Sequence, residues 1–259
     1  MAEAPYVIRQ FEIERHLAVD LFGLDVSFTN SAAAMTATVL VVAGFLWLAM
    51  RPAALVPGRL QAAAEALYGF VAETVMTAIG PDGRRHLPFL LTLFVYILFG
   101  SLIGLTPVKF TFTSHVVVTL GLGLIVFGYV TVLGFRRQGL GFFRSFLPAG
   151  TPWFVAPLVV LVEVVSYLLR PITLGVRLFA NVLAGHIMIK LFADFSAALN
   201  EGLGLAGFLL GLLPVLMTAV FYGFETVVFV IQAYIFVLLA CVYIREASER
   251  HGEGVPHHA

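Results

Sequence analysis

The stretch that decides the fold runs from Val160 to Lys190 and reads VLVEVVSYLLRPITLGVRLFANVLAGHIMIK. It is apolar enough to lie in a lipid bilayer, yet it contains two arginines, an acid, an amide and a histidine. An ionisable side chain in hydrocarbon costs about 2.5–3.5 kcal/mol on insertion scales, so such side chains usually face protein or a water-filled cavity. Arg170 and Arg177 in one membrane segment therefore require a functional explanation.

One face of a helix collects most of these polar side chains. At about 100° per residue, Glu163, Arg170 and Arg177 fall on the same face because they are spaced by seven residues. Ser166 and Asn181 lie close to that face. Glu163 is its only acid, and the sequence offers no obvious carboxylate for both arginines. We therefore expect the arginine face to point outward, toward another subunit.

A purely structural role stays open for two of these side chains. Arg170 lies next to Pro171, so it can instead be neutralised by a static salt bridge or extend to the lipid headgroups. Asn181 can serve only to hydrogen-bond a neighbouring helix. Arg177 has apolar neighbours on both sides, so for this residue we expect a function.

The composition predicts an integral membrane protein. Of 259 residues, 60% are hydrophobic and 12% are charged, and the mean hydropathy is +0.99. Soluble proteins average roughly 25% charged residues. The formal net charge is zero, so we expect no nucleic-acid partner. The single cysteine, Cys241, lies in an apolar run and is expected to be a buried structural thiol.

Neither end of the chain suggests chemistry. Residues 1–30 contain several acids and do not have the pattern of a signal peptide, so we expect the first span to act as its own insertion signal. The last residues include His251, His257 and His258, but their spacing is poor for a metal site. We expect no metal and no cofactor.

The hydropathy pattern predicts one all-α membrane domain over residues 1–259. Its expected parts are a polar segment (1–30), one N-terminal span (32–50), an interfacial amphipathic helix (58–80), a span pair (87–135), two long helices (153–198 and 203–246) and a polar tail (247–259). A helix of about forty residues reaches roughly 60 Å, so the two long helices must tilt strongly, lie nearly flat or break. We expect them to form a hairpin.

Prolines and glycines mark the expected bends and close contacts. The long helices offer bending positions at Pro171 and Gly175 and at Pro214 and Gly223. The second helix of the span pair has small residues that would allow close packing against a neighbour: Gly121, Gly123 and Gly128.

Positive charges between the spans predict the orientation. The basic residues that fall on one side are Arg51, Arg59, Arg84, Arg85, Arg136, Arg137 and Arg144. Cytoplasmic loops carry the excess of Lys and Arg, so this side is predicted to be inside and the N-terminus outside. Five crossings then place the C-terminus in the cytoplasm.

The last long helix carries a second polar group. Glu225 and Gln232 are seven residues apart and share a face. In a hairpin, His186 is expected to face Glu225, and both side chains can change protonation in such a setting. Arg177 cannot deprotonate and acts as a fixed positive charge. We expect His186 and Glu225 to form a proton-accessible pair.

These residues carry a resemblance to a known family. The run LLRPITLGVRLFANVLAGH, with VEVVS before it and FETVVFVIQAYIFVLLACVYI after it, resembles subunit a of the F-type ATP synthase, the membrane stator beside the rotating ring of c subunits. The resemblance covers most of the chain. It implies the same architecture of one span, an interfacial helix, a span pair and two long tilted helices.

The resemblance implies a role for each polar residue. Arg177 matches the essential arginine that faces the ion-carrying carboxylate of the ring. His186 and Glu225 match the pair that lines the outer half-channel. The remaining matches are polar neighbours of the arginine (Asn181 and Gln232), groups lining the inner half-channel (Glu163 and Ser166) and a basic position beside it (Arg170). In the loop FTSHVVVT, His115 stands where many bacterial members have an acid.

The implied function is proton translocation coupled to rotation and ATP synthesis. The implied partners are the c-subunit ring, the peripheral stalk of subunit b and the rest of the ATP synthase, together with protons and membrane lipids. A composition rich in Ala, Gly and Arg, together with the style of the matching motifs, favours the bacterial inner membrane over the mitochondrial one. The chain lacks a GxxxxGK[ST] phosphate loop, so nucleotide chemistry is expected on other subunits.

Two other functions remain open. A self-contained proton- or sodium-coupled transporter would need paired repeats or a complete internal ion site, and the sequence displays neither. A scaffold that transports nothing would tolerate replacement of Arg177. The choice between proton and sodium is expected to depend mainly on the ring subunit.

Overall fold

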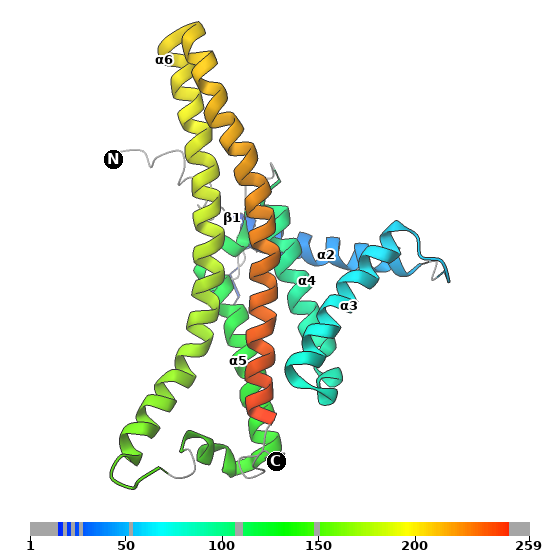
Figure 1. Cartoon of the computed structure of the whole chain (residues 1–259), viewed down its shortest axis with the longest axis vertical. Helices are drawn as coiled ribbons and strands as arrows, with labels where there is room; N and C mark the ends of the chain where they lie inside the picture. Colours follow the sequence, from blue (N-terminus) through cyan, green and yellow to red (C-terminus); the bar gives the residue numbers. More distant parts are fainter. Residues whose placement is uncertain are drawn as a thin grey trace, which may run out of the picture.

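The chain is helical, with a long hairpin at its centre (Figure 1). The computed structural model describes residues 15–17, 20–21, 24–25, 28–51, 54–106, 111–147 and 151–248. The helices are α2 (Asn30–Met50), α3 (Arg59–Ile79), α4 (Leu87–Gly104), α5 (Val116–Gln138) and α6 (Ala156–Ser248), with 3-10 helices η1 (Pro81–Arg85), η2 (Phe112–Ser114) and η3 (Gly139–Phe146). The predicted helical membrane class is confirmed.

In the described residues before α2, the chain forms four very short strands. They are β1 (Arg15–Leu17), β2 (Asp20–Leu21), β3 (Leu24–Asp25) and β4 (Phe28–Thr29). β1 pairs antiparallel with β4, and β2 with β3. α2 then begins with a side-chain cap, in which the Ala32 amide donates to the Thr29 hydroxyl at 3.3 Å. The polar segment predicted for this region therefore contains local β structure.

Helix α6 folds back on itself as a hairpin of two arms. The first arm is Ala156–Asn200 and the second arm is Leu209–Ser248. The Ser196 hydroxyl donates to the Gly211 carbonyl at 3.0 Å, and the rings of Phe192 and Phe221 stack 5.2 Å apart across the hairpin. Pro171 and Pro214 lie inside the helix, and Figure 1 shows the first arm curving away from the second toward its N-terminal end.

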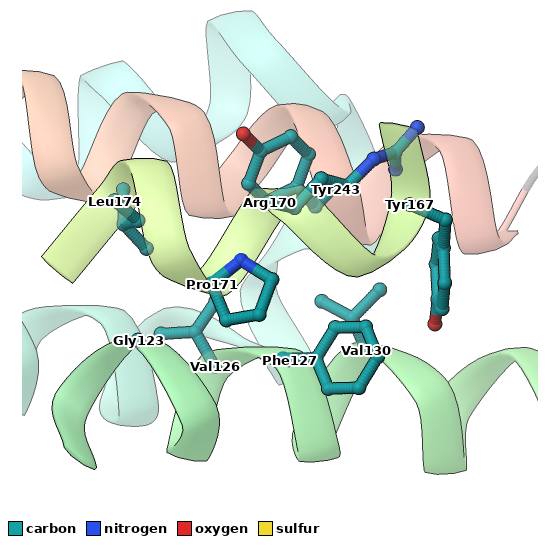
Figure 2. A pocket seen from close by; sticks show the side chains of 9 residues that line it. All are labelled: Gly123, Val126, Phe127, Val130, Tyr167, Arg170, Pro171, Leu174 and Tyr243. Carbon is teal, nitrogen blue, oxygen red and sulfur yellow. The ribbon is translucent and has the colours of Figure 1, made fainter. Parts of the chain in front are cut away.

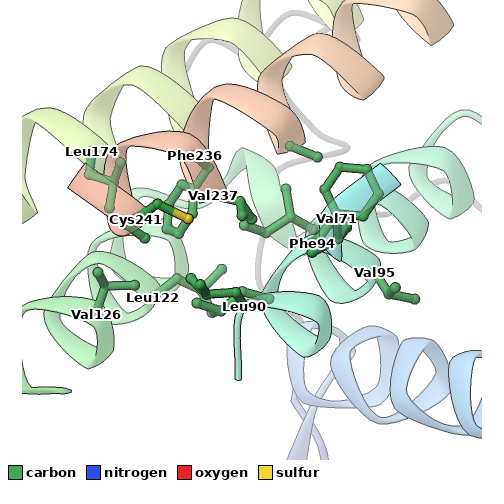
Figure 3. Close-up of a cluster of buried hydrophobic side chains, with 14 of the residues drawn as sticks. Val71, Leu90, Phe94, Val95, Leu122, Val126, Leu174, Phe236, Val237 and Cys241 are labelled. Atoms are coloured by element: carbon green, nitrogen blue, oxygen red, sulfur yellow. The ribbon is translucent and has the colours of Figure 1, made fainter. Parts of the chain in front are cut away.

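The core lies where α3, α4, α5 and both arms meet. Figure 3 shows side chains from all of these helices in one apolar cluster, among them Val71, Phe94, Leu122, Leu174 and Phe236. The predicted burial of Cys241 is confirmed, since its side chain is fully buried in this cluster. The second arm therefore supplies much of the face that holds the bundle together.

Glycine lets α5 approach the first arm closely, but only at particular positions. A Cβ added at Gly123 would lie 2.5 Å from the Pro171 carbonyl oxygen, and one added at Gly175 would lie 2.8 Å from the Thr119 carbonyl oxygen. Nothing lies within 4 Å of such an atom at Gly121 or Gly128. The predicted packing role is right for Gly123 and wrong for the other two, because they point away from the contact.

Six helical segments of the described chain are long and apolar enough to cross a membrane. They are α2, α3, α4, α5 and the two arms of α6. The chain is therefore a multi-pass membrane protein. The interfacial position of 58–80 and the division into segments stay predictions.

Candidate functional site

Arg177 projects from the middle of the first arm and is exposed. Its neighbour Leu178 is fully buried, so the arm packs on the bundle by one face while Arg177 leaves from another. In the described part of the chain, no carboxylate lies within ion-pair distance of this guanidinium. The predicted outward direction of the arginine face therefore holds at Arg177.

Arg170, seven residues earlier, turns inward. Its guanidinium lies 2.5 Å from a Glu246 carboxylate oxygen on the second arm, and it lies 4.9 Å from the Tyr243 ring centroid. Tyr167 points the other way, toward α5, where its hydroxyl lies 2.6 Å from that of Thr131 (Figure 2). The small cavity in Figure 2 has a volume of about 10 Å³, so it barely admits one water molecule.

The prediction that both arginines point outward is therefore wrong for Arg170. The missing carboxylate is Glu246, which lies on the other arm. Of the two structural alternatives for Arg170, the structure has the salt bridge within its own chain. The cause is the hairpin, which brings residues 76 positions apart into contact.

A groove between the arms holds Glu225. We call it the Glu225 groove; its lining residues are Asn181, Ala184, Gly185, Met188, Phe221, Phe224, Glu225 and Val228. It has a volume of about 190 Å³, enough for several water molecules. The Glu225 carboxylate packs directly against the α-carbon of Gly185, where any side chain would collide with it.

Several polar atoms in the Glu225 groove have no partner among the described residues. Both carboxylate oxygens of Glu225 and the side-chain nitrogen of Asn181 are buried without a hydrogen bond to this part of the chain. An unpaired buried polar group costs about 1–3 kcal/mol, so such groups are usually satisfied by water, an ion or a partner. The groove is therefore built to hold water or a group from another molecule.

His186 is buried beside this groove but turns to a different neighbour. Its Nε2 lies 3.1 Å from the Thr111 hydroxyl, and its ring lies 6.3 Å from that of Phe229. Glu225 packs on Gly185, the residue before His186, but no hydrogen bond joins His186 to Glu225. The proton-accessible pair of His186 and Glu225 stays a prediction.

The other predicted site residues are dispersed. Glu163 is half-buried and Ser166 is exposed, both near the N-terminal end of the first arm, while Gln232 is buried on the second arm. His115 is half-buried at the start of α5, where burial lowers the pKa of its imidazole below the usual value. The structure does not test the roles of these residues.

Sequence reasoning missed two residues that contact the predicted site, Glu246 and Thr111. Glu246 follows a long apolar run and looks like the start of a polar tail. Thr111 stands in a cluster of small hydroxyl residues, TFTS, before His115, and that cluster is the only available signal. Both contacts link distant parts of the chain.

Charged side chains also tie two loops together at the end of the molecule where α3 meets α4. Arg137, at the end of α5, lies 3.6 Å from Asp82 in η1. His86 is buried there, with its Nδ1 2.7 Å from the Tyr129 hydroxyl. Burial, and then the charge of Arg137, lower the pKa of His86. The loop after α3 and the end of α5 therefore lie on one side.

No group of three potential metal-ligating side chains occurs among the described residues. The histidines at 251, 257 and 258, for which no metal site was expected, lie outside that part of the chain.

The fold and the site define a class: a multi-pass membrane protein whose long hairpin presents an exposed arginine, without a carboxylate partner in the described residues, and a buried acid further along the same hairpin. The family model for the ATP synthase A chain matches residues 32–245. ATP synthase subunit a of Chelativorans sp. (strain BNC1) is 47% identical over 240 residues, covering 93% of this chain and 96% of the relative. ATP synthase subunit a of Brucella canis is 44% identical over 249 residues, covering 95% of this chain and 98% of the relative. The chain belongs to the ATP synthase A chain family.

Proposed function

We propose that this chain is the proton-translocating stator subunit of an F-type ATP synthase, beside a rotating ring of c subunits. The observation that carries the proposal is the exposed Arg177 on a membrane helix without a carboxylate partner in the described chain. A permanent cation at that place is costly unless an acid from another chain meets it. A ring that presents one carboxyl group after another would do so.

The outer proton path is assigned to His186 and Glu225. The Glu225 groove supports this assignment, because it combines water-sized space with unpartnered polar atoms of Asn181 and Glu225. A proton that leaves this groove would neutralise a ring carboxylate. The neutral carboxyl group can then turn into lipid at far lower cost than the charged form.

The inner path is assigned to Glu163 and Ser166, with Gln232 as a polar neighbour of Arg177. A ring carboxyl that approaches Arg177 is driven to ionise, since a nearby positive charge typically lowers a carboxyl pKa by about 1–3. The released proton leaves through the inner path. Arg177 also repels protons that would otherwise pass directly between the two paths.

The orientation and surroundings follow from the charges. The contact between Arg137 and Asp82 joins the end of α5 to the turn after α3, and both carry further basic residues, which supports their placement on the cytoplasmic side. The N-terminus would then lie outside and the C-terminus inside, in a bacterial inner membrane. The remaining partners would be the subunit b stalk, the other ATP synthase subunits and lipids.

Replacement of Arg177 tests this function. In inverted membrane vesicles that contain the complete ATP synthase, Arg177→Ala is expected to abolish ATP-driven proton pumping while the subunit stays inserted. Pumping is followed by a pH-sensitive dye and insertion by immunoblotting. Arg51→Ala is the matched control, because this exposed arginine lies over the Trp47 ring at the end of α2, away from both arms of the hairpin. Normal pumping by Arg177→Ala would refute the proposal.

A further inference from the structure

The 3-10 helix η2 is seated on two glycines of α4. A Cβ added at Gly100 would lie 2.5 Å from the Phe112 ring, and one added at Gly104 would collide with the Thr111 hydroxyl. The two glycines are four residues apart, so they open one face of α4 by a full turn. In membrane helices, this spacing commonly lets another helix approach. Here it receives the short turn that leads into α5.

This seat holds the Thr111 hydroxyl between two groups. The oxygen lies 3.3 Å from the Gly104 carbonyl oxygen and 3.1 Å from Nε2 of His186. Thr111 is 7% exposed and His186 is 8% exposed, so water competes little for this contact. The seat therefore links the turn between α4 and α5 to the first arm at His186.

A single hydroxyl can serve both protonation states of this histidine. When Nε2 carries a lone pair, the hydroxyl donates its proton to it. When Nε2 carries a hydrogen, the hydroxyl accepts that hydrogen and donates its own proton to the Gly104 carbonyl, which stands at the unpaired end of α4. Rotation about one bond is enough to move between the two arrangements.

We propose that Thr111 is a positioning residue for proton transfer, which holds the His186 ring in one orientation while its hydroxyl follows the protonation of Nε2. The inference rests on the proposed function and extends it to a residue outside the two arms. Because the hydroxyl engages Nε2, it fixes which ring nitrogen remains for proton exchange with another group.

Other groups around His186 can also titrate or carry charge. Glu225 approaches from the second arm, through its contact with Gly185. Lys190 lies one turn further along the first arm and acts on His186 through its charge. A test must therefore separate the loss of the hydroxyl from a general disturbance of these groups.

The test uses proteoliposomes that contain the complete ATP synthase. The rate of proton-driven ATP synthesis is measured at several lumen pH values and a fixed membrane potential. Thr111→Val keeps the shape but removes the hydroxyl; we expect a rate up to about tenfold lower, as for one lost hydrogen bond. The pH of the half-maximal rate is also expected to move. Thr111→Ser should restore both properties.

Thr119→Val is the matched control. Its hydroxyl is also buried, and within the described residues it donates to the His115 and Val116 carbonyl oxygens at the start of its own helix. Its rate and pH profile should match those of the unmodified complex. If the valine at 111 prevents assembly, Thr111→Ala removes the same hydroxyl without an added methyl group and is judged by the same two readouts.

Arg177→Ala is measured in the same preparation. If Arg177→Ala is inactive while the hydroxyl-free variant keeps the normal rate and pH profile, the inference about Thr111 is overturned and the proposed function stands. If Arg177→Ala synthesises ATP normally, the proposed function itself fails. A lower rate that serine does not rescue also overturns the inference, because it indicates a packing role.

Discussion

Arg170 and Arg177 lie seven residues apart on the same arm, yet their surroundings differ completely. Arg170 is enclosed by its own chain, with Glu246 at 2.5 Å and the rings of Tyr167 and Tyr243 beside it. Arg177 is exposed and has no carboxylate partner in the described chain. The same residue type, at positions one heptad apart, thus lies in two different environments.

The difference follows from what the hairpin brings opposite each arginine. Near Arg170, the second arm supplies an acid and an aromatic ring, so the charge is compensated locally. Around Arg177, the arm turns its apolar side to the core and leaves the guanidinium outside. A cation neutralised within its own chain stabilises the fold. The Arg177 guanidinium, on the outside of the helix bundle, is available to a second molecule.

The largest effect beyond loss of Arg177 itself is expected at Glu225, which is buried on the second arm against Gly185. Glu225→Gln keeps the shape but cannot release a proton, so proton-driven ATP synthesis should fall by about 10²-fold, the scale of a lost acid–base group. Assembly should stay normal. Glu65→Gln, at an exposed position on α3, is the control. An unchanged rate would remove Glu225 from the path.

The second effect concerns stability near Arg170. Gly123→Ala would force a methyl group against the Pro171 carbonyl, so the purified subunit should lose about 1–3 kcal/mol of unfolding free energy. Gly128→Ala, with open space around it, should be neutral or stabilising. Thermal unfolding in detergent compares the two. Equal behaviour of both variants would show that the close approach of α5 to the first arm contributes nothing.

The smallest effect is expected from the ion pair of Arg170. Glu246 is half exposed, so a double-mutant cycle of Arg170→Ala and Glu246→Gln should give a coupling of about 1 kcal/mol or less in unfolding free energy. No such cycle can be built for Arg177, because the described residues offer it no carboxylate partner. Replacement of Arg177 should therefore leave the unfolding temperature unchanged. A large loss of stability in Arg177→Ala would remove the contrast between the two arginines.

Sequence reasoning reached the helical architecture because its signals are local. Apolar runs, their lengths and the polar side chains inside them reveal a span pair and two long helices without any knowledge of contacts. Exposure of Arg177 followed from the same kind of argument, since no acid stood nearby in the sequence.

Contacts between distant segments could not be predicted in this way. Glu246 looked like the start of a tail, although the hairpin places it beside Arg170. Gly121, Gly123 and Gly128 are equivalent in composition, and only the rotation of α5 decides which one meets the first arm. Thr111 reaches His186 because two glycines on α4 seat its turn, an arrangement that requires three segments to be placed at once.

The central claim is that the acid opposite Arg177 belongs to another polypeptide, and photo-cross-linking tests it most directly. A benzophenone amino acid at Ala180, which is exposed three residues from Arg177, is irradiated in the complete ATP synthase. The same amino acid at Leu40, exposed on α2, is the control. We predict an adduct with the ring subunit from position 180 alone. Adducts only within this chain or with lipid from position 180 would contradict the claim.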